Sequence, residues 1–326
     1  MERIAVRTKT ATVLLLFCAG FVFAEPTVPS SEDRTTVILA VGAPGEAELG
    51  GHFGQWATNW QNACRQGNAR CLTIGLTATN QLSDQDRLKE LLQNEPKTGQ
   101  AELWLVLIGH GTFDGQEAKF NLRGPDLSAT ELAAWLKPFN RPLVIIDTSS
   151  SSAPFLKQLS APERVIITAT SSGYEQNYAR FGEYLSEAIR DPQADLDKDG
   201  QTSLLEAFLT AANRVAEFYR VEGRLATEHA LLDDNGDGLG TPAQWFRGLR
   251  ATKKASDHAA LDGFRAHQIH LVRSAADRDR SPEQRARRDA IERAINELRN
   301  KKGELTEDEY YRQLETRLLE LAPFYP

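Results

Sequence analysis

An unbroken apolar stretch in the first half of the chain places the strongest constraint on its fold. Residues Leu103–Ile108 read L-W-L-V-L-I, which is too short to span a membrane and too continuous for a strand with one face in water. We therefore predict a central strand of a parallel sheet. The stretch ends at Gly109-His110-Gly111, and open α/β sheets place ligands and catalytic groups at the carboxyl ends of their strands. His110 is either such a group or the exposed residue of a tight turn.

Further apolar runs predict the rest of the sheet. They alternate with helical patterns, as in β-α-β units with right-handed crossovers. The predicted strands lie at residues 35–41, 70–76, 143–146 and 164–168. The predicted fold class is α/β, a three-layer sandwich with a mostly parallel sheet, over residues 35–250.

The N-terminus has the composition of a secretory signal peptide. Basic residues precede an apolar segment, 11–23, that is too short for a spanning helix, and Ala24 provides a small residue for cleavage. We expect residues 1–24 to be removed and the protein to be periplasmic or extracellular. The bulky residue before Cys18 does not fit a lipoprotein signal, so we expect no membrane anchor. Residues 25–34 are rich in Pro, Ser and Thr and are expected to be a flexible lead-in.

Two cysteines, Cys64 and Cys71, follow the predicted signal peptide. Because exported proteins meet an oxidising compartment, we predict a disulfide between them, with a buried thiol pair as the alternative. The formal charge of -7 argues against a nucleic-acid partner, which favours a clustered basic surface.

A polar run follows the predicted strand at 143–146. It reads D-T-S-S-S-S-A-P-F from Asp147 to Phe155. Because neighbouring parallel strands bring their carboxyl ends together, we expect these serines to lie beside His110.

The order of these motifs resembles the caspase-like cysteine peptidases, the group that holds caspases, metacaspases, gingipains and legumains. The resemblance covers about residues 35–190 and rests on I-G-H-G, V-I-I-D-T-S-S-S-S-A-P-F and I-I-T-A-T-S-S-G. It implies a caspase-like sheet and a histidine–cysteine dyad, with His110 at the histidine position. The cysteine position falls on Ser149 when aligned from Asp147, and on Ser150 when aligned from A-P-F.

The replacement of cysteine by serine has a chemical consequence. A thiol is partly ionised near neutral pH, whereas a serine hydroxyl needs an aligned base that is itself oriented by a third group. We therefore expect a peptidase homologue without cysteine-peptidase activity that binds a periplasmic protein or peptide or acts as a scaffold. The alternative is a peptidase or esterase with Ser149 or Ser150 as nucleophile and His110 as base. Asp114 or Asp147 would then be the orienting carboxylate.

Residues 195–206, here named the first Asp loop, have the spacing of an EF-hand calcium loop. Acidic side chains stand at positions 1, 3 and 5, glycine at 6, and glutamate at 12, while position 7 supplies a backbone carbonyl. The predicted ligands are Asp195, Asp197, Asp199, Gln201 and Glu206. We predict bound Ca²⁺, with a solvated Asp-rich turn as the alternative.

Residues 233–238, the second Asp loop, repeat the first half of this pattern. The predicted ligands are Asp233, Asn235 and Asp237. Position 12 falls on Gln244, which lacks the charge for bidentate binding, so we expect a weaker site or a plain turn. We interpret His229, just before this loop, as structural. An Asp-rich loop that opens a helix also resembles the bacterial caspase-like proteins.

The last part of the chain predicts a linker at 251–280 and an α-helical hairpin at 281–326. Each helix begins with a capping box, and Gly303 separates the two. The apolar stripes of these helices can pack on the α/β domain or on a second copy, which allows a homo-oligomer.

Overall fold

The computed structural model describes residues 34–77, 82–257 and 259–325. The predicted signal peptide and all but the last residue of the lead-in lie outside this range. The parallel strands of the central sheet are β1 (Thr36–Val41), β2 (Arg70–Ile74), β3 (Leu103–Ile108), β7 (Leu143–Asp147) and β8 (Arg164–Thr168). Two short antiparallel strands extend one edge, β9 (Leu231–Asp233) and β10 (Thr241–Pro242). The order across the sheet is β10-β9-β8-β7-β3-β1-β2, which confirms the predicted mostly parallel α/β fold.

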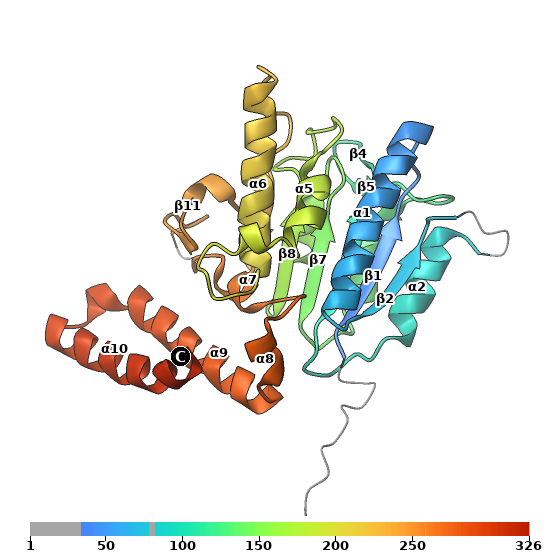
Figure 1. The fold of residues 1–326 in the computed structure, drawn as a ribbon. Helices are drawn as coiled ribbons and strands as arrows, with labels where there is room; N and C mark the ends of the chain where they lie inside the picture. Colours follow the sequence, from blue (N-terminus) through green and yellow to red (C-terminus); the bar gives the residue numbers. More distant parts are fainter. Residues whose placement is uncertain (1–33, 78–81, 258, 326) are drawn as a thin grey trace, which may run out of the picture.

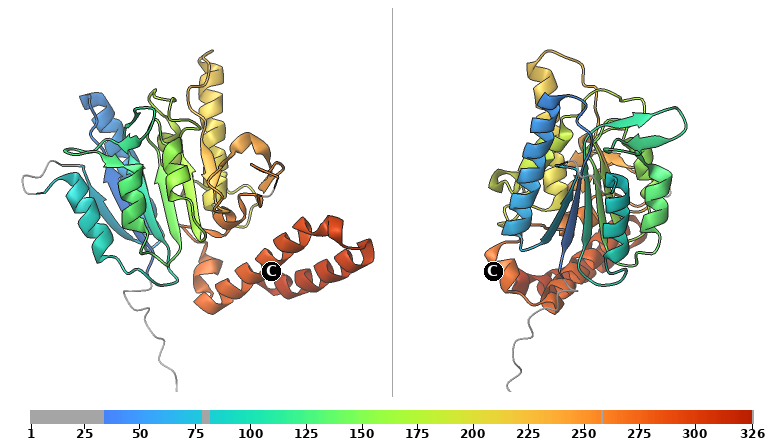
Figure 2. Two further views of the ribbon diagram at one scale, coloured as in Figure 1. Left: turned by 180° about the vertical axis from the view of Figure 1, so that it is seen from behind. Right: turned by 90° about the vertical axis from the view of Figure 1, so that its right-hand side faces the viewer.

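Helices cover both faces of this sheet, so the core has the three predicted layers (Figures 1 and 2). One face carries α1 (Ala47–Gln66), α5 (Phe181–Ala188) and α6 (Leu204–Val221). The other carries α2 (Asp84–Asn94), α3 (Ala129–Leu136) and α4 (Ala153–Leu159). Successive strand residues point to opposite faces. In β3, for example, Trp104 and Val106 enter the first core, and Leu105 and Leu107 enter the second.

Local sequence signals fix the ends of several helices. The Ser83 hydroxyl accepts a hydrogen bond from the Asp86 amide at 3.1 Å, so Ser83 is the N-cap of α2. Ser128 and Glu131 form a reciprocal capping box at the start of α3. On α1, the aromatic residues Phe53, Trp56 and Trp60 lie on one face of the helix and are buried in the core.

A small three-stranded sheet stands at the carboxyl end of β3. Its strands are β4 (Gly111–Phe113), β5 (Ala118–Phe120) and β6 (Leu127–Ser128). His110 lies between β3 and β4, and therefore at the junction of the two sheets. Figure 1 shows β4 and β5 at this end of the central sheet.

The segment after the central sheet is folded along most of its length. Two short strands, β11 (Phe246–Arg247) and β12 (Arg250–Ala251), form an arginine hairpin, named for its facing arginines. The following helices are α7 (Phe264–Gln268), α8 (Ala275–Asp279), α9 (Pro282–Asn300) and α10 (Glu307–Leu321). Residues 251–280 therefore differ from the expected linker, because Ala266, Ile269 and Leu271 are buried in the main core. The C-terminal hairpin, α9 and α10, extends from the domain on the side of the amino ends of the strands (Figure 1).

Cys64 and Cys71 are free thiols in the structure, so the predicted disulfide is replaced by the alternative thiol pair. Cys64 on α1 is buried and Cys71 on β2 is partly buried. A hydrogen bond between the two side chains, together with burial, raises the pKa of Cys64, and the same hydrogen bond lowers the pKa of Cys71 to about 7. Among the described residues, no helix is both long and apolar enough to cross a bilayer.

Candidate functional site

His110 lies at the carboxyl edge of β3, as predicted from the sequence. Its half-buried ring packs edge-on against Phe53 and Tyr178, with ring centroids 5.2 Å and 6.2 Å apart. Its Nε2 atom donates to the carbonyl oxygen of Pro44 at 3.2 Å, in the loop between β1 and α1. The ring is thus held by an aromatic wall and one backbone carbonyl.

The serine run lies against the residue that follows His110. A Cβ atom at Gly111 would stand 2.2 Å from the carbonyl oxygen of Ser150 and 2.7 Å from Oγ of Ser149. Only glycine permits this close approach. The structure therefore brings the two predicted dyad segments together at one edge of the sheet.

The serine hydroxyls are nevertheless engaged with groups other than the histidine. Ser149 is fully buried, and its Oγ donates to Oδ1 of Asp147 at 2.6 Å. Ser150 is 3% exposed; its Oγ donates to the carbonyl oxygen of Gly111 at 3.1 Å and accepts from the Gly111 amide at 3.3 Å. In the described part of the chain, no hydrogen bond joins the His110 ring to either hydroxyl.

The two carboxylates that could orient the histidine serve other groups. Asp147 ends β7 fully buried, and its Oδ1 accepts from both the amide and the hydroxyl of Ser149. Burial raises the pKa of Asp147 to about 6. Asp114 lies in the turn between β4 and β5, where the amides of Gln116 and Glu117 donate to it. These contacts position the serine loop and the turn.

Glu175 is a residue of this region that the sequence did not single out. Its carbonyl accepts from the amide of Ser151, and its carboxylate accepts from the amide and hydroxyl of Ser171. The same carboxylate lies 2.6 Å from Nδ1 of His229. Glu175 thus links the serine loop, the loop after β8 and the segment before β9. One glutamate in a polar loop gives no pattern from which these contacts could be predicted.

The first Asp loop gathers three of its predicted calcium ligands. Oxygen atoms of Asp195, Asp197 and Asp199 all lie within 4.8 Å of one another. The Asp195 carboxylate accepts from the amides of Lys198 and Gly200 at 2.6 Å and 3.1 Å, which winds the loop around it. Carboxylate oxygens are the ligands that calcium prefers, so this donor set fits a hard divalent cation.

The side chains of the other two predicted ligand residues make different contacts, although the ligand atom predicted for Gln201 is its backbone carbonyl. Glu206 begins α6, and its carboxylate accepts from the amides of Leu196 and Ser203 at 2.7 Å and 2.8 Å. It also closes a capping box with Ser203. The Gln201 side chain donates to Asp199 and accepts from the amide of Ser274. The structure therefore separates Glu206 from the group of three aspartates.

The second Asp loop has the same turn but a different neighbour. Asp233 accepts from the amides of Gly236 and Gly238 at 2.9 Å and 3.0 Å. Asn235 and Asp237 accept from amides two residues further along the chain. Behind the loop, the buried Asp262 accepts from the amides of Asp234 and Asn235. Its pKa is raised to about 8 by burial and by the charge of Asp234.

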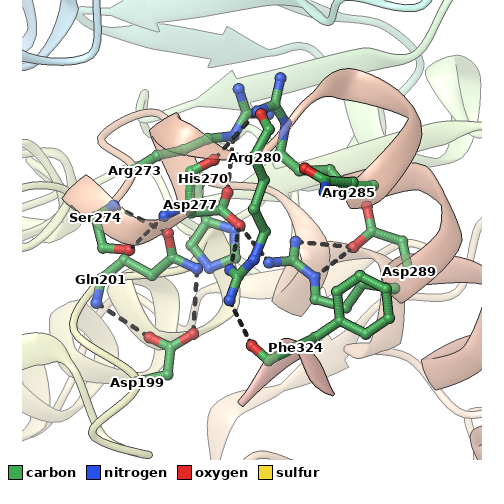
Figure 3. A network of polar contacts seen from close by, with 12 residues as sticks. Asp199, Gln201, His270, Arg273, Ser274, Asp277, Arg280, Arg285, Asp289 and Phe324 are labelled. Carbon is green, nitrogen blue, oxygen red and sulfur yellow. Dashed lines mark hydrogen bonds and ion pairs between the residues drawn. The ribbon is translucent and has the colours of Figure 1, made fainter. Parts of the chain in front are cut away.

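The first Asp loop is tied to the C-terminal hairpin by a polar network centred on Asp277 (Figure 3). This fully buried carboxylate lies 3.0 Å from Arg280 and 3.5 Å from Arg273, and it also pairs with Arg288. Burial opposes its ionisation, but the arginines, Arg288 first, keep the pKa of Asp277 below its ordinary value. The contact between Gln201 and Ser274 joins this network to the loop.

The solved structures that are similar to this chain include two caspases. The Drosophila initiator caspase Dronc shares 15% identity over 63% of this chain and 81% of its own, with a TM-score of 0.43. Caspase-1 from Spodoptera frugiperda shares 10% identity over 62% of this chain and 87% of its own, with a TM-score of 0.38. Raptor from Chaetomium thermophilum shares 9% identity over 48% of this chain and 17% of its own, with a TM-score of 0.33.

Two of these three structures are caspases. At these identities and TM-scores the similarity assigns no role to any residue, so the roles assigned here rest on the geometry of this chain. No family model and no curated protein matches the sequence.

Proposed function

We propose that this chain is an exported, caspase-like binding protein that lacks cysteine-peptidase activity and is stabilised by calcium. Its partner would be a periplasmic protein or peptide. Export is supported by the composition of residues 1–24. The remaining parts of the proposal rest on the sheet edge and on the first Asp loop.

The proposed absence of peptidase activity rests on one observation. At the two positions where the caspase resemblance expects cysteine, the side chains are buried hydroxyls that donate to Asp147 and to the carbonyl of Gly111. A serine nucleophile needs its proton taken by a base within hydrogen-bond reach, and the His110 ring bonds to Pro44 instead. The serine hydroxyls and the His110 ring therefore connect the loops at this edge of the sheet.

Calcium is proposed from the chemistry of the first Asp loop. Three carboxylates within 4.8 Å of one another repel, and a bound cation would neutralise this charge. The ligands would be Asp195, Asp197 and Asp199, with the backbone carbonyl of Gln201. Glu206 would bind the ion only if its carboxylate gave up the capping box with Ser203. A bound ion would supply folding free energy and take no part in bond cleavage.

A fluorophosphonate probe tests the absence of a serine nucleophile. We expect the full-length protein to remain unlabelled, because the hydroxyls of Ser149 and Ser150 are buried and neither is hydrogen-bonded to the His110 ring. Labelling would be followed by gel fluorescence beside an active serine hydrolase, with Ser149→Ala, Ser150→Ala and His110→Ala as variants. The control is Ser256→Ala, at an exposed serine outside the sheet edge. Labelling that disappears in His110→Ala and in one of the two serine variants, but persists in Ser256→Ala, would establish the alternative hydrolase.

A further inference from the structure

A recess lies between the C-terminal hairpin and the segment around the arginine hairpin. Its volume is about 340 Å³, which lies in the range of small ligand sites. Leu249 and Phe264 line it from the domain, and Ile295, Leu318 and Leu321 line it from α9 and α10. Leu318 is 46% exposed, so apolar surface stays open to solvent here.

Three arginines, Arg247, Arg250 and Arg299, also line the recess. All three are exposed, and within the described residues none of their side chains has an ion pair or hydrogen bond. The two acidic residues that line it bind other groups. Asp262 accepts from Thr241, and Glu292 lies 3.9 Å from Arg288 and accepts from Tyr325 and Gln268. In a chain with a formal charge of -7, this recess therefore combines apolar side chains with three arginines that no described carboxylate pairs.

The arginine hairpin adds a second observation. Arg247 and Arg250 are directly opposed in the register of β11 and β12, so their side chains leave the same face of the hairpin. Like charges in this arrangement repel each other and destabilise the pair of strands. A bound carboxylate would relieve that repulsion, since a guanidinium binds a carboxylate through two parallel hydrogen bonds.

We propose that this recess binds a peptide segment in which carboxylate side chains flank a large apolar one. The apolar side chain would enter between Leu249 and Leu318, and the carboxylates would pair with Arg247, Arg250 and Arg299. A concave site lined by arginines and apolar side chains fits a peptide better than it fits the flat surface of a bilayer. This assignment deepens the proposed binding function by naming its surface and partner class, and it requires neither calcium nor the sheet edge.

Selection from a randomised heptapeptide library displayed on phage tests this assignment with the full chain. The test variant is the double substitution Arg247→Glu with Arg250→Glu. Its matched control is Arg190→Glu with Arg224→Glu, which changes the net charge equally at two exposed arginines that do not line the recess. We expect the unmodified chain to enrich peptides with two or more acidic residues beside Leu, Phe or Trp. In fluorescence anisotropy, the affinity for the best peptide should fall about tenfold or more in the test variant and stay unchanged in the control.

Several outcomes would overturn the assignment. These are the enrichment of no peptide, the enrichment of peptides without acidic residues, and equal affinity in the test and control variants when both melt like the unmodified chain. Binding to phosphatidylglycerol vesicles in place of peptides would make the surface a membrane site. A dimer that only the test variant loses would make the occupant a second copy. Fluorophosphonate labelling of the same proteins reports on the sheet edge alone, so its result separates failure of this assignment from failure of the proposed function.

Discussion

The two Asp loops have the same local construction and different surroundings. In each, the first aspartate accepts from the amides at positions 4 and 6 of the loop, as Asp195 and Asp233 both show. In each, the residue at position 5 accepts from the amide two residues further on, as Asp199 and Asp237 both show. A short Asp–Gly pattern is therefore sufficient to fix the turn.

The difference lies in what stands behind each turn. The first Asp loop gathers three carboxylates and leaves Asp197 and Asp199 exposed. The second has asparagine at position 3 and is held from behind by the buried carboxylate of Asp262. The comparison shows that a shared sequence pattern specifies the backbone conformation of the turn. The residues around the turn decide whether several carboxylates gather there and can bind a cation.

The largest expected effect is a calcium response confined to the first Asp loop. When calcium exceeds its dissociation constant about 100-fold, binding should add about 2.7 kcal/mol to the free energy of unfolding. Asp199→Asn should reduce this gain, because it removes one of the three gathered negative charges and leaves a neutral amide oxygen in its place. Asp237→Asn, the same change at the same position of the second Asp loop, is the matched control and should keep it. Melting in calcium and in chelator measures both.

Two results would contradict the predicted difference in calcium response between the two Asp loops. An unchanged melting temperature in calcium and in chelator would remove the metal from the first Asp loop. Equal loss of the calcium response in Asp199→Asn and Asp237→Asn would show that the two loops respond as one.

The next effect concerns the carboxylate behind the second Asp loop. Because burial raises the pKa of Asp262 to about 8, the folded chain binds its proton more tightly than the unfolded chain does. The stability that this proton contributes is complete below the ordinary pKa of an aspartate and is lost as the pH rises through about 8. Asp262→Asn should therefore raise the free energy of unfolding at pH 8 by about 1–3 kcal/mol, with no gain near pH 4.

Urea unfolding in chelator at several pH values measures this difference. Asp279→Asn, an exposed aspartate of α8, is the matched control and should show little effect at any pH. If the stability of Asp262→Asn follows the same pH profile as the unmodified chain, the buried carboxylate is not the source of the dependence.

The smallest effect tests whether the second Asp loop lacks only its last ligand. Gln244→Glu places a carboxylate at position 12, where a calcium loop has its bidentate glutamate. In the background of Asp199→Asn, where the first Asp loop should respond less to calcium, we expect an added calcium-dependent stabilisation of about 1 kcal/mol or less. Calcium titration followed by the melting temperature would detect it. If calcium raises the melting temperature of the double variant no more than that of Asp199→Asn alone, this expectation is contradicted.

Much of the fold could be predicted because its signals are local. The apolar stretch at β3, the N-cap at Ser83 and the capping box at Ser281 each depend on residues within a few positions of one another. The close approach of Gly111, the residue after His110, to the serine run was also predictable, since the ends of neighbouring parallel strands converge.

The contacts that complete the site could not be predicted, because they join segments far apart in sequence. Asp262 supports amides 28 and 27 residues before it, and Glu175 contacts His229, which lies 54 residues later. The sequence predicts a linker at 251–280 because this segment is mostly polar. The few apolar residues that reach the core, such as Ile269 and Leu271, form no recognisable helix or strand pattern. For Ser149 and Ser150, the sequence predicted their place at the edge of the sheet. It could not predict which groups accept the hydrogen bonds of their hydroxyls.

The Asp277 network has a consequence for how the molecule unfolds. Arg288 on α9 is one of the partners of a fully buried carboxylate on α8, and Gln201 binds the backbone just before that helix. Separating the C-terminal hairpin would remove Arg288 from Asp277 and leave Arg273 and Arg280 beside it. The cost should therefore stay below the about 3–5 kcal/mol of a buried charge with no partner. This ion pair couples the first helix of the hairpin to the body of the protein, so opening the hairpin at α9 costs a buried contact.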